Sequence, residues 1–188
     1  NAIYCYEQAL SEFEHLSMDN GKMLALKQLA FIYSHTGHID KSIECYEKAF
    51  SIQNIRDVER MQFAQDLCRL YATIGNLEQK NRYADLIEAI FAETNDKETQ
   101  ISYYSYKAKE NQSQGWYDLA EQYYLKALDL AKIFAENGKD AYLYQMYFDM
   151  GILCRDLGRN DEAVSYLLQS LGKDTIISEY NYLTYIQM

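Results

Sequence analysis

Residues 34–50, SHTGHIDKSIECYEKAF, bring several chemically reactive side chains close together in the sequence. Within eleven residues the stretch holds two histidines, an aspartate and a cysteine, namely His35, His38, Asp40 and Cys45. These residue types bind transition metals and take part in nucleophilic catalysis. A glycine between two segments with helical periodicity is also typical of a turn between helices. The rest of the chain has to decide between a chemical site and a turn.

The other reactive side chains form no recognisable catalytic pattern. The sequence contains no G-x-S-x-G, P-loop or G-x-G-x-x-G motif, and its carboxylates are spread along predicted helix faces. The cysteines lie far apart without a C-x-x-C pair, so we interpret them as small buried residues in a reducing compartment: Cys5, Cys45, Cys68 and Cys154. The sequence therefore predicts no enzymatic activity, no cofactor and no metal site.

The composition indicates a helical protein with a sizeable core. The chain has 188 residues, of which 48% are hydrophobic, and it contains no proline and only 8 glycines. Its net charge of −10 disfavours a surface for nucleic acids, which need basic side chains to neutralise phosphates. No apolar run is long enough to span a membrane. We expect a cytoplasmic protein without membrane contact.

Four glycines mark an internal repeat. Gly37, Gly75, Gly115 and Gly158 follow one another at intervals of 38, 40 and 43 residues. The residues seven positions before these glycines are all small: Ala30, Cys68, Ala108 and Gly151. The residues five positions after them are small in three of four cases: Ser42, Lys80, Ala120 and Ala163. Small residues let two facing helices approach closely. The pattern predicts helix hairpins that bury their apolar faces by stacking.

These hairpins resemble the tetratricopeptide repeat family. Leu26-x2-Leu29-Ala30-x2-Tyr33, followed by Ser42-x3-Tyr46, is similar to the family pattern W-x2-L-G-x2-Y…A-x3-F, and degenerate forms recur up to about residue 171. Equivalent positions within a hairpin always lie 23 residues apart, whereas those between hairpins lie 15 to 20 apart. We therefore expect longer helices and loops along one edge, as in bacterial regulatory members of the family.

The resemblance implies an all-α fold, a right-handed superhelical solenoid of antiparallel helix pairs with about ten helices. We expect residues 1–188 to be one solenoid, truncated at both ends, with units at about 1–16, 21–54, 58–93, 98–136 and 140–171 and a partial helix at 175–188. Both ends are expected to expose apolar surface. In this alignment His35 and His38 fall in a hairpin turn, so we interpret them as surface residues.

The resemblance also implies a function, because the first helix of each pair lines the concave groove in this family. We expect recognition of a protein or peptide, as part of a larger scaffold or regulator. Carried over by position, the groove residues are Lys27, Phe31, Gln65, Arg69, Ser105, Lys109, Phe148, Ile152 and Arg155. This set contains four cations and no carboxylate, so we expect an acidic partner or a free C-terminus.

Two other functions stay open. The chain is compatible with the sensor region of a bacterial transcriptional regulator whose DNA-binding domain lies elsewhere, since this segment is not expected to contact nucleic acid itself. It is also compatible with a structural module that oligomerises through exposed solenoid ends.

Overall fold

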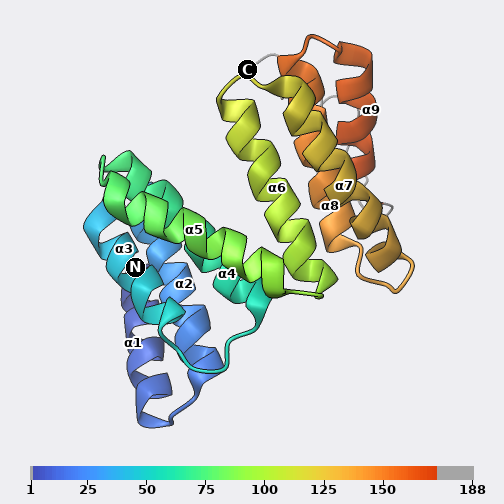
Figure 1. Cartoon of the computed structure of the whole chain (residues 1–188). Coiled ribbons are helices and arrows are strands. Elements are labelled where there is room, and N and C mark those ends of the chain that lie inside the picture. The colour runs from blue at the N-terminus through green and yellow to red at the C-terminus, as the bar shows by residue number, and fades with distance from the viewer. Residues whose placement is uncertain (1, 173–188) are drawn as a thin grey trace. The chain divides into compact units, whose positions relative to one another are not determined.

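The computed structural model describes residues 2–172, and these form nine α-helices and no strand (Figure 1). The helices are α1 (Ala2–His15), α2 (Asp19–His35), α3 (Ile39–Phe50), α4 (Asp57–Thr73), α5 (Leu77–Glu93), α6 (Lys97–Ser113), α7 (Tyr117–Ala135), α8 (Ala141–Asp156) and α9 (Asn160–Ser170). The predicted all-α fold is confirmed. The partial helix expected at 175–188 lies outside the described residues.

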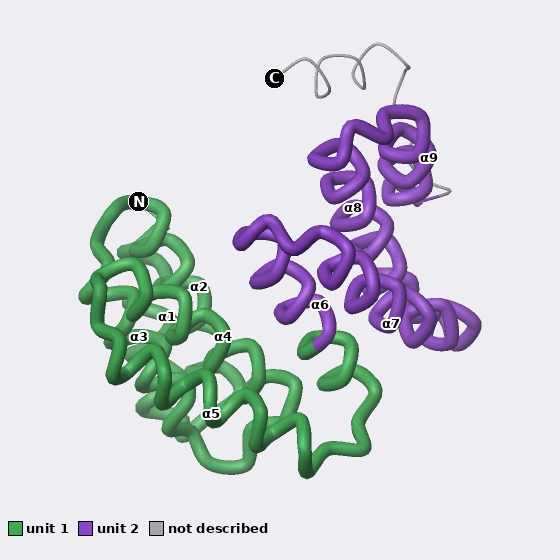
Figure 2. The backbone as a smooth tube through the Cα atoms, turned by 45° about the horizontal axis from the view of Figure 1, so that its top comes forward, with its two compact units in different colours: residues 1–103 green, residues 104–188 purple. Residues whose placement is uncertain are grey.

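The chain divides into two units, residues 1–103 and 104–188, and the boundary falls within α6 (Figure 2). In unit 1 each helix from α1 to α4 packs against the next helix along the chain. In unit 2, α8 packs against both α7 and α9. Consecutive helices as neighbours are the arrangement expected of stacked hairpins. That residues 1–188 form one solenoid stays a prediction.

The recurring glycine is explained by the geometry of the hairpin turn. Gly37, Gly75, Gly115 and Gly158 all have positive φ angles, between +73° and +81°. The residue after each glycine donates its N–H back into the preceding helix, as from His38 to the Tyr33 carbonyl at 2.9 Å. This is the Schellman motif, which requires a left-handed residue after the helix and therefore favours glycine.

The small residues lie where the two helices of a hairpin approach closely, as expected. Ser42 Oγ on α3 donates to the carbonyl of Ala30 on α2 at 2.8 Å. On α8, a Cβ added at Gly151 would lie 2.7 Å from Leu167 Cγ of α9. Larger residues at these positions would force the two helices apart.

The variable spacing between hairpins is taken up mainly by the second helices. Helices α3, α5 and α7 contain 12, 17 and 19 residues. Their lengths increase in the same order as the spacings of 15, 17 and 20 residues that follow from the sequence alignment. The longer second helices were therefore predictable from sequence spacing alone.

Tyrosines on the first helices α2 and α4 contact the second helix that precedes each of them. The Tyr33 hydroxyl donates to Glu7 of α1 at 3.0 Å, and the Tyr71 hydroxyl donates to Glu47 of α3 at 2.7 Å. Tyr33 and Tyr71 occupy the same repeat position, and so do the two glutamates. The same interaction thus recurs at successive repeat interfaces in unit 1.

The cysteine prediction was wrong for one residue. Cys68 and Cys154 are buried and Cys45 is half-buried, but Cys5 is exposed because α1 is a surface helix without a buried residue. None of the helices in residues 2–172 is long and apolar enough to cross a membrane.

Candidate functional site

The nine predicted groove residues all lie on the first helices of hairpins, α2, α4, α6 and α8. We call the residues in unit 1 the unit 1 face: Lys27 and Phe31 on α2, with Gln65 and Arg69 on α4. The residues in unit 2 form the unit 2 face: Ser105 and Lys109 on α6, with Phe148, Ile152 and Arg155 on α8. Each face is described separately.

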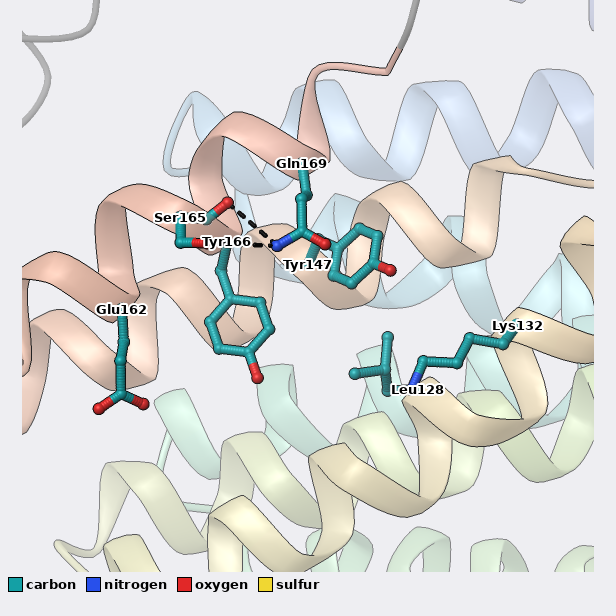
Figure 3. Close-up of a pocket in the computed structure, with 7 residues that line it drawn as sticks. All are labelled: Leu128, Lys132, Tyr147, Glu162, Ser165, Tyr166 and Gln169. Atoms are coloured by element: carbon teal, nitrogen blue, oxygen red, sulfur yellow. Dashed lines mark hydrogen bonds between the residues drawn. The ribbon is translucent and has the colours of Figure 1, made fainter.

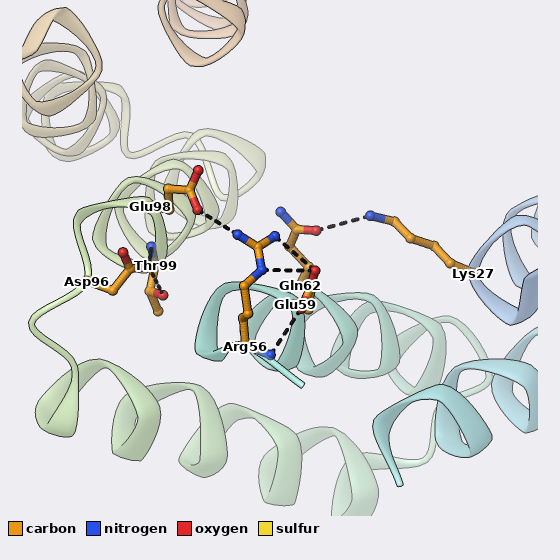
Figure 4. A network of polar contacts seen from close by, with 7 residues as sticks. All are labelled: Lys27, Arg56, Glu59, Gln62, Asp96, Glu98 and Thr99. Carbon is orange, nitrogen blue, oxygen red and sulfur yellow. Dashed lines mark hydrogen bonds and ion pairs between the residues drawn. The ribbon is translucent and has the colours of Figure 1, made fainter. Parts of the chain in front are cut away.

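Two polar residues of the unit 1 face connect successive first helices. Lys27 Nζ on α2 donates to Gln62 Oε1 on α4 at 3.1 Å (Figure 4). One repeat later, Gln65 Nε2 donates to the Ser102 carbonyl of α6 at 3.1 Å, and the Ser102 hydroxyl donates back to Gln65 Oε1 at 3.3 Å. Both contacts use equivalent positions. These side chains therefore help to align the helices that carry the face.

The rest of the unit 1 face is exposed. Phe31 is 53% exposed, and Leu24, two turns earlier on the same side of α2, is also exposed. The ring of His35 lies against Phe31, with a centroid separation of 4.1 Å. Arg69 is exposed and bonds Asp66 at 2.9 Å. The unit 1 face therefore presents an apolar strip on α2 and an exposed ion pair on α4.

The unit 2 face contains a buried carboxylate that was not among the groove residues predicted from the internal repeats. Asp149 on α8 accepts hydrogen bonds from Lys109 Nζ at 3.0 Å, Gln145 Nε2 at 3.1 Å and the Ser105 hydroxyl at 3.5 Å. A signal for it exists, because Asp66 occupies the equivalent position two repeats earlier. Phe148, next to Asp149, is 45% exposed.

A second carboxylate, Asp156, lies at the end of α8. It accepts hydrogen bonds from Gln112 Nε2 at 2.7 Å and from the Arg155 guanidinium at 2.9 Å. Three of the four predicted cations thus have a carboxylate partner, whereas Lys27 bonds a neutral amide. The faces are less cationic than the predicted residues alone suggested.

A polar network fixes the N-terminal ends of α4 and α6 in unit 1 (Figure 4). Arg56 bonds Glu59 at 2.9 Å and Glu98 of α6 at 3.0 Å. The Thr99 hydroxyl donates to Asp96 Oδ2 at 2.7 Å. Burial alone would raise the pKa values of Glu59 and Asp96, but hydrogen bonds from Arg56 and Thr99, respectively, lower them overall. The ionised carboxylates stabilise this corner.

Acidification is expected to weaken this corner. Carboxylates with lowered pKa values contribute stability at pH values above their ordinary pKa, 4.5 for Glu59 and 3.8 for Asp96, and lose it as the pH falls through the folded-state values. The protection of α4 and α6 amides against hydrogen exchange, relative to an unfolded chain at the same pH, should therefore fall below pH 4. Arg56→Gln should reduce this pH dependence, and identical profiles for the variant and wild type would contradict the assignment.

Each histidine of residues 34–50 lies against a nearby backbone carbonyl. His35 Nδ1 lies 2.9 Å from the Phe31 carbonyl and His38 Nδ1 lies 3.0 Å from the Thr36 carbonyl. Burial raises the pKa of the Cys45 thiol, which disfavours the reactive thiolate. Within residues 2–172, no group of three or more histidine, cysteine or acidic residues could hold a metal ion.

A pocket of about 380 Å³ lies among α7, α8 and α9 of unit 2, away from the predicted residues (Figure 3). The rings of Tyr147 and Tyr166 contribute to its wall, with centroids 6.2 Å apart. The remaining lining residues are Leu128, Lys132, Glu162, Ser165 and Gln169. The pocket is open to solvent and mixes one cation with one anion.

Comparisons with known proteins agree with the helix-hairpin architecture. A model of the tetratricopeptide repeat family matches residues 26–55, 101–134 and 144–172. It does not match residues 56–100, although α4 and α5 pack as a hairpin there. The curated proteins compared with the chain include no significant match.

Two solved structures share the fold. The crystal structure of BtubC (BKLC) from P. vanneervenii is 17% identical with a TM-score of 0.66, and the match covers 94% of this chain and 74% of that one. The STAND protein with a tetratricopeptide repeat sensor from Pyrococcus horikoshii is 22% identical with a TM-score of 0.61, over 88% of this chain and 24% of that one. The matches to the family model identify the chain as a tetratricopeptide repeat protein over residues 26–55, 101–134 and 144–172.

Proposed function

We propose that the faces of the first helices bind a peptide or an extended segment of a partner protein, and that the chain serves as a recognition module of a larger scaffold or regulator. Tetratricopeptide repeats generally mediate protein–protein interaction. The observation that carries the proposal is that each face exposes an aromatic ring, Phe31 by 53% and Phe148 by 45%. Exposed aromatic side chains are typical anchors of protein interfaces.

The unit 1 face suits an acidic side chain of the ligand. Within residues 2–172, Lys27 bonds the neutral amide of Gln62 and no carboxylate lies within hydrogen-bonding distance of its ammonium group. The ion pair of Arg69 is exposed, and such a pair is exchanged at little cost. A carboxylate of the ligand would therefore find two cations beside the apolar strip of Phe31.

Selection from a phage-displayed library of short random peptides tests the proposal. Peptides that bind the wild-type chain should bind Phe31→Ser or Phe148→Ser about 10-fold or more weakly, as expected for interface anchors. Leu125→Ser is the matched control, because Leu125 is similarly exposed but lies on α7, a second helix. Binding that survives both phenylalanine substitutions, or no binding at all, would reject the first-helix faces as the recognition surface.

A regulatory sensor is the second candidate function. The similar Pyrococcus horikoshii protein carries a tetratricopeptide repeat sensor, and this chain spans about a quarter of that protein's length. A sensor of this kind would convert ligand binding into a change in an attached domain. The cytoplasmic location expected from the sequence stays a prediction.

A further inference from the structure

Asp149 is a buried charge placed directly beneath the unit 2 face. Its side chain is only 6% exposed, whereas the side chain of its cationic partner, Lys109, is 53% exposed. Gln145 holds the Oδ1 atom, while Lys109 and Ser105 contact Oδ2. The carboxylate is therefore held in place by neutral donors, and Lys109, its one cationic partner among residues 2–172, is the more exposed member of the pair.

The two members of this pair respond differently to a ligand. Lys109 can move into water at small cost, since its side chain is already half-exposed and its stem is flexible. Asp149 cannot follow, and a buried carboxylate without a cation is strongly unfavourable. An acidic ligand that pairs with Lys109 would leave the buried carboxylate of Asp149 without a cationic partner. A cationic ligand that takes Asp149 would release Lys109 to solvent and leave no buried charge unpaired.

We infer that the unit 2 face binds a peptide segment with an arginine or lysine next to an apolar side chain, and that Asp149 determines this charge preference. The inference rests on the proposed function of the first-helix faces. The basic side chain replaces Lys109 at Asp149. The apolar side chain packs on Phe148 and on Ile152, which lies one turn further along the same side of α8.

Two further features favour a cation at this face. Asp156, two turns beyond Asp149 on α8, is exposed, and its partners in the described part of the chain are the half-exposed Arg155 and the amide of Gln112. The chain as a whole carries a net charge of −10, which attracts basic segments over distance. The expectation of an acidic partner therefore applies to the unit 1 face, and the unit 2 face prefers the opposite charge.

Fluorescence anisotropy with three synthetic peptides tests the inference. The peptides share one length and a central phenylalanine, which is flanked on both sides by arginine, by glutamine or by aspartate. The arginine peptide should bind the full chain at least about 10-fold more tightly than the aspartate peptide at matched ionic strength. Asp149→Asn should remove most of this preference. Glu162→Gln, which removes the same charge from α9 outside the face, should leave it intact.

Lys109→Gln distinguishes this inference from the expectation of an acidic partner, because the two predict opposite changes in peptide affinity. The substitution removes the internal competitor, so it should tighten binding of the arginine peptide, by about 3-fold or more. If instead the aspartate peptide binds best and Lys109→Gln weakens it, the charge preference is refuted while recognition by the faces stands. If no peptide binds, or if Phe148→Ser leaves every affinity unchanged, recognition by the unit 2 face fails as well.

Folding of the variants is controlled separately. Lys109→Gln leaves Asp149 without its cation and is expected to lower the melting temperature. The double variant Lys109→Gln/Asp149→Asn removes both charges and restores the balance. It should fold as well as wild type and discriminate among the three peptides much less than wild type does, and an undiminished preference for arginine in this variant would overturn the role of Asp149.

Discussion

Raising the pH above 10 is expected to unfold the chain, because buried tyrosines resist ionisation in the folded state. Burial raises the pKa values of Tyr46, Tyr71 and Tyr124 far above the ordinary value of 10. Nearby carboxylates raise them further: Asp66 beside Tyr46, Glu47 beside Tyr71, and Asp149 with Asp156 near Tyr124. All three tyrosines are at most 9% exposed.

The direction and size of this effect follow from proton linkage. Between pH 10 and the raised pKa values, the folded chain keeps phenolic protons that the unfolded chain has lost, so the free energy of unfolding falls as the pH rises. Each such tyrosine lowers the free energy of unfolding by about 1.4 kcal/mol per pH unit. Three together cost about 4 kcal/mol per pH unit, against a total stability of about 5–15 kcal/mol for a typical domain.

Two spectroscopic signals measured over the same pH range check this prediction. Tyrosinate absorbance should show one group of tyrosines that ionises only together with the loss of helical circular dichroism. Tyr71→Phe should make the loss of stability with pH less steep by one proton. Ionisation of all 19 tyrosines near pH 10 with the helices intact would contradict the prediction.

The hairpins could be predicted from the sequence because single residues specify them. A positive φ angle at Gly115 and a close helix approach at Gly151 leave almost no alternative to glycine, so the repeat is visible even though most other positions vary. The family model does not match residues 56–100, where Lys80 replaces the small residue. There the Cys68 thiol lies 3.5 Å from the Lys80 carbonyl, so the backbones are still close.

The candidate site was only partly predictable. The exposure of Phe31 and Phe148 follows from the helical register, which is a local property of one helix. The ion pair between Lys109 and Asp149 joins residues forty positions apart, and it depends on the length of α7, which differs from that of the other second helices. Register identifies which residues share a face, but the pairing of charges depends on how adjacent hairpins stack.

Phe63→Ala is expected to destabilise unit 1 by about 3–5 kcal/mol, the typical cost of removing a fully buried aromatic ring. Phe63 lies on α4 with no exposed surface, and its ring centroid is 6.1 Å from that of Tyr46 on α3. The substitution leaves a cavity between α3 and α4, where two hairpins pack against each other. Urea unfolding monitored by circular dichroism measures the loss.

Phe31→Ala is the matched comparison, since it removes the same side chain from an exposed position on α2. Its free energy of unfolding should stay within about 0.5 kcal/mol of wild type, as for most surface substitutions. Its affinity for peptides selected on the wild-type chain should nevertheless fall. Equal destabilisation by both substitutions would mean that Phe31 is a packing residue. If only Phe63→Ala lowers the stability and Phe31→Ala lowers the affinity for peptides, Phe63 is a residue that stabilises the fold and Phe31 is a residue that binds the ligand.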